Sequence, residues 1–214
     1  LGWVLIEILE QPMFSEAHLA QSVTMLSSIL KQDTKETFSL LIQTLQTLIK
    51  NTRIDSETKK TFWQCQLKHM LNPEIVLKLL KTPLEWEEHT NNVVDDLVSI
   101  AGADFFRTVF HILEVEPHLS TRKQAIRFLI GCGSAVIPFA VAQLKNPKWF
   151  VVRNMLVILK DLKGADEVLH IIPCMKHQAA QVRLAGLQTL DTLIPETDLF
   201  LNTLNTALRD SDES

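Results

Sequence analysis

The chain has 214 residues, of which 46% are hydrophobic and 21% charged, and its formal net charge is -4. This length and composition allow one large domain or two small ones with a continuous core. The acidic total excludes a bulk attraction for nucleic acid or for an anionic membrane. Only six glycines, with abundant Leu, Gln, Lys and Glu, favour helices over strands.

The cysteines and the apolar runs indicate where in the cell the protein is located. Cys65, Cys132 and Cys174 are odd in number and far apart, which favours reduced thiols and a cytoplasmic location. The opening run from Trp3 to Leu9 carries Glu7 and is too short to span a bilayer, so we interpret it as a core helix. Since later apolar runs also fall short of about 18 residues, the sequence predicts no membrane span.

Two amphipathic helices are predicted next, over residues 15–31 and 34–50, with a short connection between them. Asp33 and Glu36 have the spacing of a capping box at the start of the second helix. Short connections make antiparallel neighbours. The predicted apolar stripes are Leu19, Val23, Leu26 and Leu30, then Phe38, Leu41, Ile42, Leu45, Leu48 and Ile49.

A third helix is predicted over residues 55–71. Asn72 and Pro73 end it and begin the next, because asparagine caps a helix and proline suits the first helical position. Thr82 to Glu85 repeats this device as a second capping box. Residues 1–90 therefore form helical hairpins, which either continue a repeat array or cap it. The residues expected to be buried in the third helix are Phe62, Trp63, Leu67 and Met70.

From residue 91 onwards one pattern recurs with a period of about 31 residues. Three glycines and three arginines mark it, and apolar columns support its register. Periods of this size indicate stacked helical units. The sequence therefore predicts an all-α fold, a right-handed α-solenoid of antiparallel helix pairs over residues 91–214. The markers are Gly102, Gly133 and Gly164, Arg122, Arg153 and Arg183, and the columns Leu97, Phe128, Leu159, Leu190 and Phe106, Ile137, Val168, Leu199.

Each unit is predicted to hold a first helix after the glycine and a second helix that bears the arginine. The first helices are expected at 104–113, 135–144 and 166–175, and the second helices at 120–130, 148–162 and 179–194. Glycine is expected to close each second helix, and Pro195 replaces it in the last unit. The final Arg209 to Ser214 repeats the beginning of the phrases at 145–153 and 176–183 without their Val-Arg. We therefore expect a domain of a longer protein that continues with Val-Arg.

The repeat resembles a known family in several short motifs. These are Ile137-Pro138, the run from Leu144 to Pro147, Val152-Arg153, and Leu159 followed by the run from Leu162 to Val168. Together they resemble the bacterial HEAT-repeat consensus, the type also found in phycobilisome-lyase-like proteins. The resemblance implies a protein-binding scaffold whose second helices line a concave side. The family that the repeat resembles also includes minorities that bind DNA, attach bilins or hydroxylate with iron.

Candidates for chemistry are few. His170, Cys174 and His177 have a spacing that would place three zinc-type ligands on one helical face, but Pro173 would strain that face and a fourth ligand is not apparent. The glycine-rich run from Gly131 to Ala135 follows a helix, so it is a turn and not a phosphate loop. The His-Glu dipeptides of the iron-dependent relatives do not occur. The sequence predicts no metal, no cofactor and no enzymatic activity.

Charge distribution gives the most specific prediction. Between residues 120 and 190 there are ten basic against three acidic side chains, a balance of +7 that leaves -11 for the rest. A basic groove on an acidic body suits an acidic protein surface or phosphates. For the repeated arginines, a structural role that ties one turn to the next is favoured over a binding role. Trp149 is equally compatible with a plug between repeats and with a binding anchor. The candidate partner-binding residues are Lys123, Arg127, Trp149, Arg153, Lys160 and Arg183.

Three functions remain open. An interaction scaffold that binds an acidic protein or peptide on its concave face follows from the architecture and is our main prediction. A nucleic-acid binder, similar to HEAT-like alkylpurine glycosylases, is the alternative, and the acidic total counts against it. An enzyme or lyase subunit is the third, and no residue pattern supports it.

Overall fold

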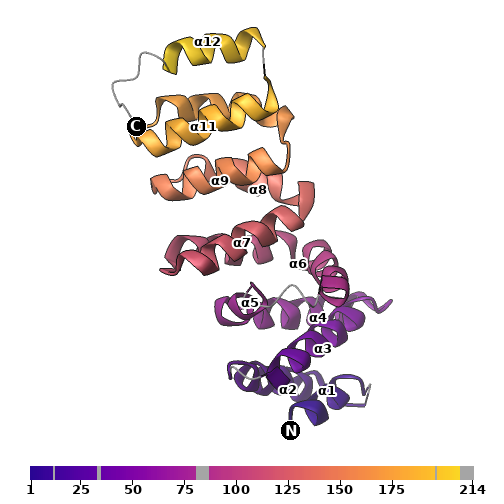
Figure 1. Ribbon diagram of the computed structural model, residues 1–214. Coiled ribbons are helices and arrows are strands. Elements are labelled where there is room, and N and C mark those ends of the chain that lie inside the picture. Colours follow the sequence, from indigo (N-terminus) through magenta and orange to yellow (C-terminus); the bar gives the residue numbers. More distant parts are fainter. Residues whose placement is uncertain (12, 33–34, 81–86, 196, 208–214) are drawn as a thin grey trace. The chain divides into compact units, whose positions relative to one another are not determined.

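The computed structural model describes residues 1–11, 13–32, 35–80, 87–195 and 197–207, and within them every regular element is a helix (Figure 1). The chain divides into two compact units, Leu1–Pro117 and His118–Ser214, here called unit 1 and unit 2. This division follows packing, whereas the predicted boundary near residue 90 follows the repeat pattern. The start of the repeats at residue 91 stays a prediction.

Unit 1 is built around its third helix. That helix packs against α1, α2, α4 and α6, and the predicted apolar stripe explains why: Leu41, Leu45 and Leu48 are fully buried, while Phe38 is half-buried. The helices of unit 1 are α1 (Gly2–Leu9), α2 (Glu16–Leu30), α3 (Lys35–Thr52), α4 (Glu57–Met70), α5 (Pro73–Leu80) and α6 (Glu87–Val115).

The outer helices of unit 1 follow the same logic. The opening run forms a core helix, as predicted, with its apolar side facing inward and Trp3 48% exposed on the other side. In α4, Trp63 is buried as predicted and Phe62 is half-buried. Asn72 caps α5, since its side-chain oxygen accepts the backbone N–H of Ile75 at 3.2 Å. Asp33, the predicted partner of Glu36 in a capping box, and the predicted capping box from Thr82 to Glu85 lie outside the described residues.

The prediction that Gly102 separates two helices is wrong. α6 runs without a break from Glu87 to Val115 and contains Gly102 in its interior. A glycine in a helix interior costs only about 0.5–1 kcal/mol relative to alanine. Packing of the long α6 against α3, α4 and α5 outweighs that cost. The glycine therefore marks the repeat in sequence without ending a helix.

Because a Cβ atom added at Gly102 would meet no heavy atom within 4 Å, we expect Gly102→Ala to stabilise unit 1. Alanine restricts the unfolded chain and prefers the helical conformation, so the expected gain is about 0.5–1 kcal/mol. Urea denaturation followed by circular dichroism measures it. Gly133→Ala is the matched control and should destabilise, because Gly133 has a φ of +66° that an alanine tolerates poorly.

Unit 2 consists of short helices arranged in pairs. The second helix of each pair is a regular α-helix, whereas the first contains 3₁₀ segments. The predicted first helices at 135–144 and 166–175 each begin with a 3₁₀ turn, and the last one returns to 3₁₀ geometry where Pro173 interrupts the α-helical bonds. The elements are α7 (Leu119–Gly131), η2 (Gly133–Val136), α8 (Ile137–Gln143), α9 (Trp149–Asp161), η3 (Ala165–Glu167), α10 (Val168–Ile171), η4 (Ile172–Lys176), α11 (Ala180–Leu193) and α12 (Asp198–Ala207).

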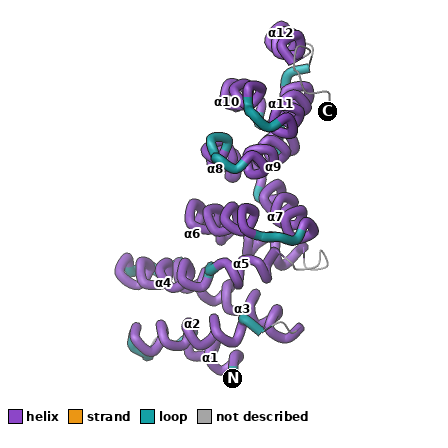
Figure 2. The backbone as a smooth tube through the Cα atoms, turned by 90° about the vertical axis from the view of Figure 1, so that its left-hand side faces the viewer, coloured by secondary structure: helices purple, strands orange, loops and turns teal. Residues whose placement is uncertain are grey.

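The second helices of unit 2 stack in chain order. α9 packs against α7 on one side and α11 on the other, while α8 covers α9 and the α10–η4 segment covers α11. α8 and α10 therefore form one layer and α9 and α11 the other (Figure 2). Helix pairs stacked in this way are the architecture of an α-solenoid. The predicted second helices at 120–130, 148–162 and 179–194 are confirmed within a residue or two.

The prediction that a glycine closes each second helix is confirmed at the end of α7, whereas at the end of α9 the left-handed position lies one residue before the glycine. After α7, Gly133 has the left-handed φ of +66°, as a helix-closing glycine should. After α9 the left-handed residue is Lys163, with φ 52°, and not Gly164. The N–H of Gly164 bonds to the carbonyl of Leu159 and that of Lys163 to Lys160, both at 3.1 Å, which is a Schellman motif. The glycine thus lies one residue beyond the position that needs it.

Among the described residues, no single helix is long and apolar enough to cross a membrane. Two consecutive segments, Leu119–Gly131 and Gly133–Gln143, together reach the required length and composition, with a bend of 116° between them.

Candidate interaction surface

One side of unit 2 presents equivalent positions of α7, α9 and α11 to solvent. These are the first residue of each helix and the residues four, eight and eleven positions later, which lie within about 80° of one another on a helix. All of them are exposed or half-buried. We call this surface the α7–α9–α11 face. Its residues are Leu119, Lys123, Arg127 and Ile130, then Trp149, Arg153, Val157 and Lys160, then Ala180, Leu184, Gln188 and Asp191.

The face exists because the opposite side of each helix is needed for packing. In α9 that side is almost entirely apolar and carries Met155 and Leu156, both fully buried. With α7 and α11 on either side of α9 and α8 behind it, only one stripe of α9 reaches solvent. Figure 1 shows α7, α9 and α11 side by side in the same order in which they follow in the chain.

Five of the six sequence-predicted residues lie together on two helices of this face, and four of these five are basic. Arg127 follows Lys123 by one turn of α7, and Lys160 follows Arg153 by two turns of α9. Of the four, Lys160 is half-buried and the others are exposed. Asp191 is the acidic residue of the face and lies on α11, so positive charge is concentrated over α7 and α9. The face thus offers a local cationic surface on a chain whose net charge is -4.

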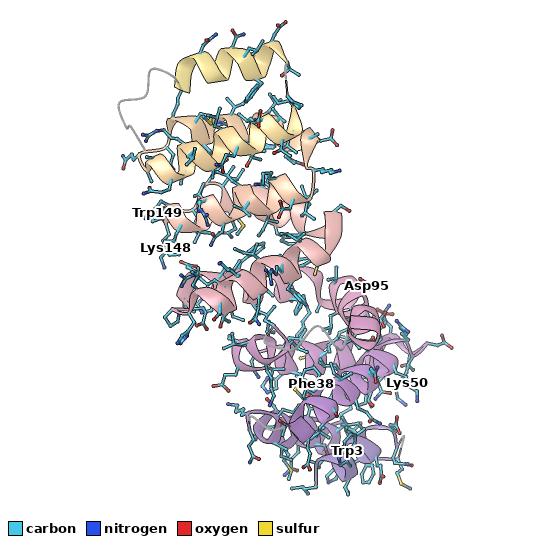
Figure 3. All side chains as sticks on the ribbon, in the orientation of Figure 1. Trp3, Phe38, Lys50, Asp95, Lys148 and Trp149 are labelled. Atoms are coloured by element: carbon cyan, nitrogen blue, oxygen red, sulfur yellow. The ribbon has the colours of Figure 1, made fainter. Side chains whose placement is uncertain are left out.

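Apolar side chains accompany these cations. Trp149 is 43% exposed at the first position of α9, and its ring meets that of Phe150 edge-on, with centroids 6.1 Å apart. Phe150 is half-buried, so the pair splits into one inward and one outward ring. Figure 3 shows Trp149 beside Lys148 at the beginning of α9. Leu119 and Leu184 are 59% and 45% exposed, and sequence reasoning missed both. Leu184 lies within the second helix predicted at 179–194, so its place there would have located it, whereas Leu119 precedes the helix predicted at 120–130.

The turn before α9 fixes the orientation of Trp149. The side-chain oxygen of Asn146 accepts the backbone N–H of Lys148 at 2.9 Å, and its amide donates to the side-chain oxygen of Gln143 at 2.9 Å. This asparagine turn therefore joins the end of α8 to the start of α9. It starts α9 immediately after Lys148 and so directs Trp149 to its first helical position.

His177 stabilises the equivalent turn in the following repeat. Its Nδ1 accepts the backbone N–H of Ala179 at 3.0 Å, the bond that Asn146 makes to Lys148. Sequence reasoning found no equivalent of Asn146 in this repeat, because histidine is not the residue expected at such a turn. The signal was available: His177 follows Asn146 by the 31-residue period.

The three repeated arginines differ in role. Arg183 is half-buried and donates to the carbonyl oxygens of His177 and Gln178, both at 2.9 Å, so it ties α11 to the turn before it. Arg153 is exposed, and its guanidinium donates to the side-chain oxygen of its neighbour Asn154, at 3.4 Å. Arg122 is half-buried. The structure therefore brings Arg153 to the α7–α9–α11 face and leaves Arg183 in a structural position beside it.

The proposed metal spacing does not form one helical face. α10 ends at Ile171 and the chain continues in 3₁₀ geometry, so His170 is exposed, Cys174 is buried and His177 bonds to the next turn. Across the described part of the chain, no cluster of three or more His, Cys, Asp or Glu side chains could hold a metal ion.

Burial instead makes the Cys174 thiol unreactive, since loss of solvation raises its pKa to about 11. We expect iodoacetamide at pH 8 to alkylate the exposed Cys65 in the native protein and to reach Cys174 only after denaturation. Peptide mass spectrometry of native and urea-treated samples measures both. Equal native labelling of the two would contradict the burial of Cys174.

The stacked helix pairs place this chain in the class of all-α helical-repeat proteins. No family model matches its sequence, and no curated protein matches it. Among solved structures, it is similar to an engineered protein at 12% identity, with a TM-score of 0.43 over 90% of this chain and 96% of that one. A second engineered protein, also 12% identical, gives 0.44 over 99% of this chain and 64% of that one.

A designed armadillo repeat protein in complex with the peptide (KR)4 gives a TM-score of 0.39 at 14% identity, over 89% of this chain and 98% of that one. These similarities are weak. The helical-repeat class therefore rests on the helix packing of unit 2 itself.

Proposed function

We propose that this protein is a non-enzymatic interaction scaffold that binds an acidic protein or peptide on the α7–α9–α11 face. The observation that carries the proposal is the presence of Lys123, Arg127 and Arg153 on the same exposed face as Trp149. Cations steer an acidic partner toward a surface, and a half-exposed indole supplies the apolar contact area that holds it. The core of an interface commonly combines aromatic residues with arginine.

The finer assignments belong to the same proposal. The 31-residue period, with Asn146 and His177 bracing equivalent turns, supports a bacterial HEAT-type repeat. We place the beginning of the repeats at residue 91 and the protein in the cytoplasm. Lys160 and Arg183 contribute at the border of the site, where bonds to the carbonyl oxygens of His177 and Gln178 hold the guanidinium of Arg183 at the turn before α11.

Nucleic acid is the second candidate, because the same cations would contact phosphates. The arrangement favours it less. Trp149 is the aromatic residue of the α7–α9–α11 face, whereas a single-strand binder interleaves several aromatic residues with its basic ones. The total charge of -4 also opposes a polyanion.

The test compares the parent protein with Lys123→Glu/Arg127→Glu in affinity capture from a nuclease-treated lysate, read by mass spectrometry, followed by titration of each retained protein in purified form. Both side chains are exposed, so the variant should keep its helix content. We expect an acidic protein to bind the parent and to bind the variant at least tenfold more weakly.

The matched control is Lys59→Glu/Lys60→Glu. It makes the same change in charge within the first turns of α4 in unit 1, where acidic residues suit a helix N-terminus. The control should retain the parent's partner. Loss of that partner from both variants would mean that net charge alone governs binding. Retention of nucleic acid before nuclease treatment, with no protein retained after it, would replace the scaffold with the nucleic-acid reading.

A further inference from the structure

We propose that the α7–α9–α11 face selects an extended, polyproline-type segment in which an apolar residue recurs at every third position and is followed by an acidic residue. This inference rests on the proposed function and specifies the conformation and the register of the partner. It follows from the spacing of stacked helices and from the arrangement of apolar and basic positions on them.

Helices packed side by side have axes about 8–10 Å apart. A polyproline II helix rises about 3.1 Å per residue with three residues per turn, so it brings the same side back after about 9.3 Å. A segment that crosses α7, α9 and α11 would therefore place every third side chain above successive helices. A β-strand does not do this, because residues three apart point to opposite faces.

The side chains on the face lie in rows. Leu119 and Trp149 occupy the first position of α7 and α9, and Lys123 and Arg153 follow them by four residues, about one helical turn of 5.4 Å. The face therefore carries an apolar row beside a basic row, both crossing the helices. With three residues per turn, a polyproline segment also has three rows of side chains.

The apolar and basic rows of the face determine the residue types in the rows of the segment that contact them. One row of the segment contacts Leu119 and Trp149 and is apolar. The second row reaches Lys123 and Arg153 and is acidic. The third faces solvent, and proline there pre-forms the bound conformation, which lowers the entropy cost of binding.

The register continues onto α11 with a difference. The first position of α11 is the half-buried Ala180, and Leu184 occupies the position that Lys123 and Arg153 hold on α7 and α9. The basic row thus ends at α9 and gives way to an apolar residue. We infer that the acidic residues of the partner lie over α7 and α9, and that its end over α11 is apolar in both rows.

The experiment uses the full 214-residue chain and fluorescence anisotropy with labelled nine-residue peptides. The first peptide is Leu-Glu-Pro-Leu-Glu-Pro-Leu-Leu-Pro, which has acidic residues over α7 and α9 and an apolar end over α11. The second has the same composition in scrambled order, and the third replaces both glutamates by lysine. A longer acidic helical peptide carries leucines seven residues apart, because a helix returns to nearly the same side after that number of residues. We expect the first to bind at least tenfold more tightly than each of the others.

Three variants locate the site. Trp149→Ala and, independently, Arg153→Glu should each weaken the first peptide at least tenfold, and the exposed side chain of Arg153 makes misfolding an unsuitable explanation for the second. The control is Leu169→Ala, which removes a 75% exposed apolar side chain from α10, outside the face. It should leave affinity unchanged.

The outcomes separate this inference from the proposed function. Equal binding of the ordered and scrambled acidic peptides, lost in Arg153→Glu, would overturn the register and leave the acidic scaffold in place. Stronger binding of the helical peptide would overturn the polyproline conformation alone. If all acidic peptides fail to bind and the lysate capture also yields no acidic partner, the proposed function falls together with this inference.

Discussion

Leu159→Ala is expected to lower the free energy of unfolding of unit 2 by about 2–5 kcal/mol. Leu159 is fully buried in α9, the helix that packs against α7, α8 and α11. Its side chain also lies against Gly164, where an added Cβ would be 3.6 Å from it. Truncation therefore removes apolar burial and leaves a cavity at the junction of several helices, which the fixed Schellman turn after α9 prevents from closing.

Hydrogen exchange followed by mass spectrometry measures this effect within each unit, because a chain with two compact units need not unfold in one step. Amides of α9 and α11 should exchange faster in Leu159→Ala, and those of α3 should not. Val157→Ala is the matched control on the same helix. Val157 is half-buried on the solvent side of α9, so its truncation should cost less than about 1 kcal/mol. Equal costs for the two would mean that the burial of Leu159 does not hold unit 2 together.

Lys78→Met is the second large effect, expected to destabilise unit 1 by about 1.5–3 kcal/mol. From α5, the ammonium group donates to the carbonyl of Leu30 at 3.2 Å, to the hydroxyl of Thr37 at 2.7 Å and to the carbonyl of Gln32. Leu30 is the last residue of α2, whose final carbonyls have no partner within their helix. Methionine retains most of the apolar stem and removes the charged donor, so it isolates the loss of these bonds.

Faster exchange of amides at the end of α2 and the start of α3, together with a lower urea midpoint, would show the expected loss. Lys50→Met is the control. Lys50 is exposed on α3, and its Nζ lies 3.8 Å from Oε1 of Glu10. An exposed ion pair of this kind contributes at most about 1 kcal/mol to the free energy of unfolding. A Lys78 variant no less stable than the control would show that water replaces the ammonium group at these carbonyls.

Sequence reasoning located the second helices and their cores well. One of these signals is local: the apolar stripe of α3 has the helical period, and such a stripe has a low free energy only when buried. The cap of Asn72 on α5 is equally local, because donor and acceptor are three residues apart. Each of these features depends on neighbours in the chain, which the sequence gives directly.

The errors are just as specific. Gly102 has the position of a helix-closing glycine, but the packing of α6 against three other helices decided that the helix continues. Lys163 adopts the left-handed conformation one residue before Gly164, because the last hydrogen bonds of α9 set the end of that helix. At Gly102 a preference of about 1 kcal/mol gives way to packing from outside the segment, and at Lys163 it gives way to the hydrogen bonds that end α9.

The candidate site divides in the same way. By itself, the sequence determined that helices recur every 31 residues and that positive charge gathers between residues 120 and 190, because periodicity and composition are properties of the chain. Only the tertiary structure decided that Lys123, Arg153 and Trp149 share one exposed face while Arg183 bonds to the turn before its helix. The physical reason is that exposure depends on which side of each helix its neighbours cover, and that side is set by the packing of α7, α9 and α11 against one another.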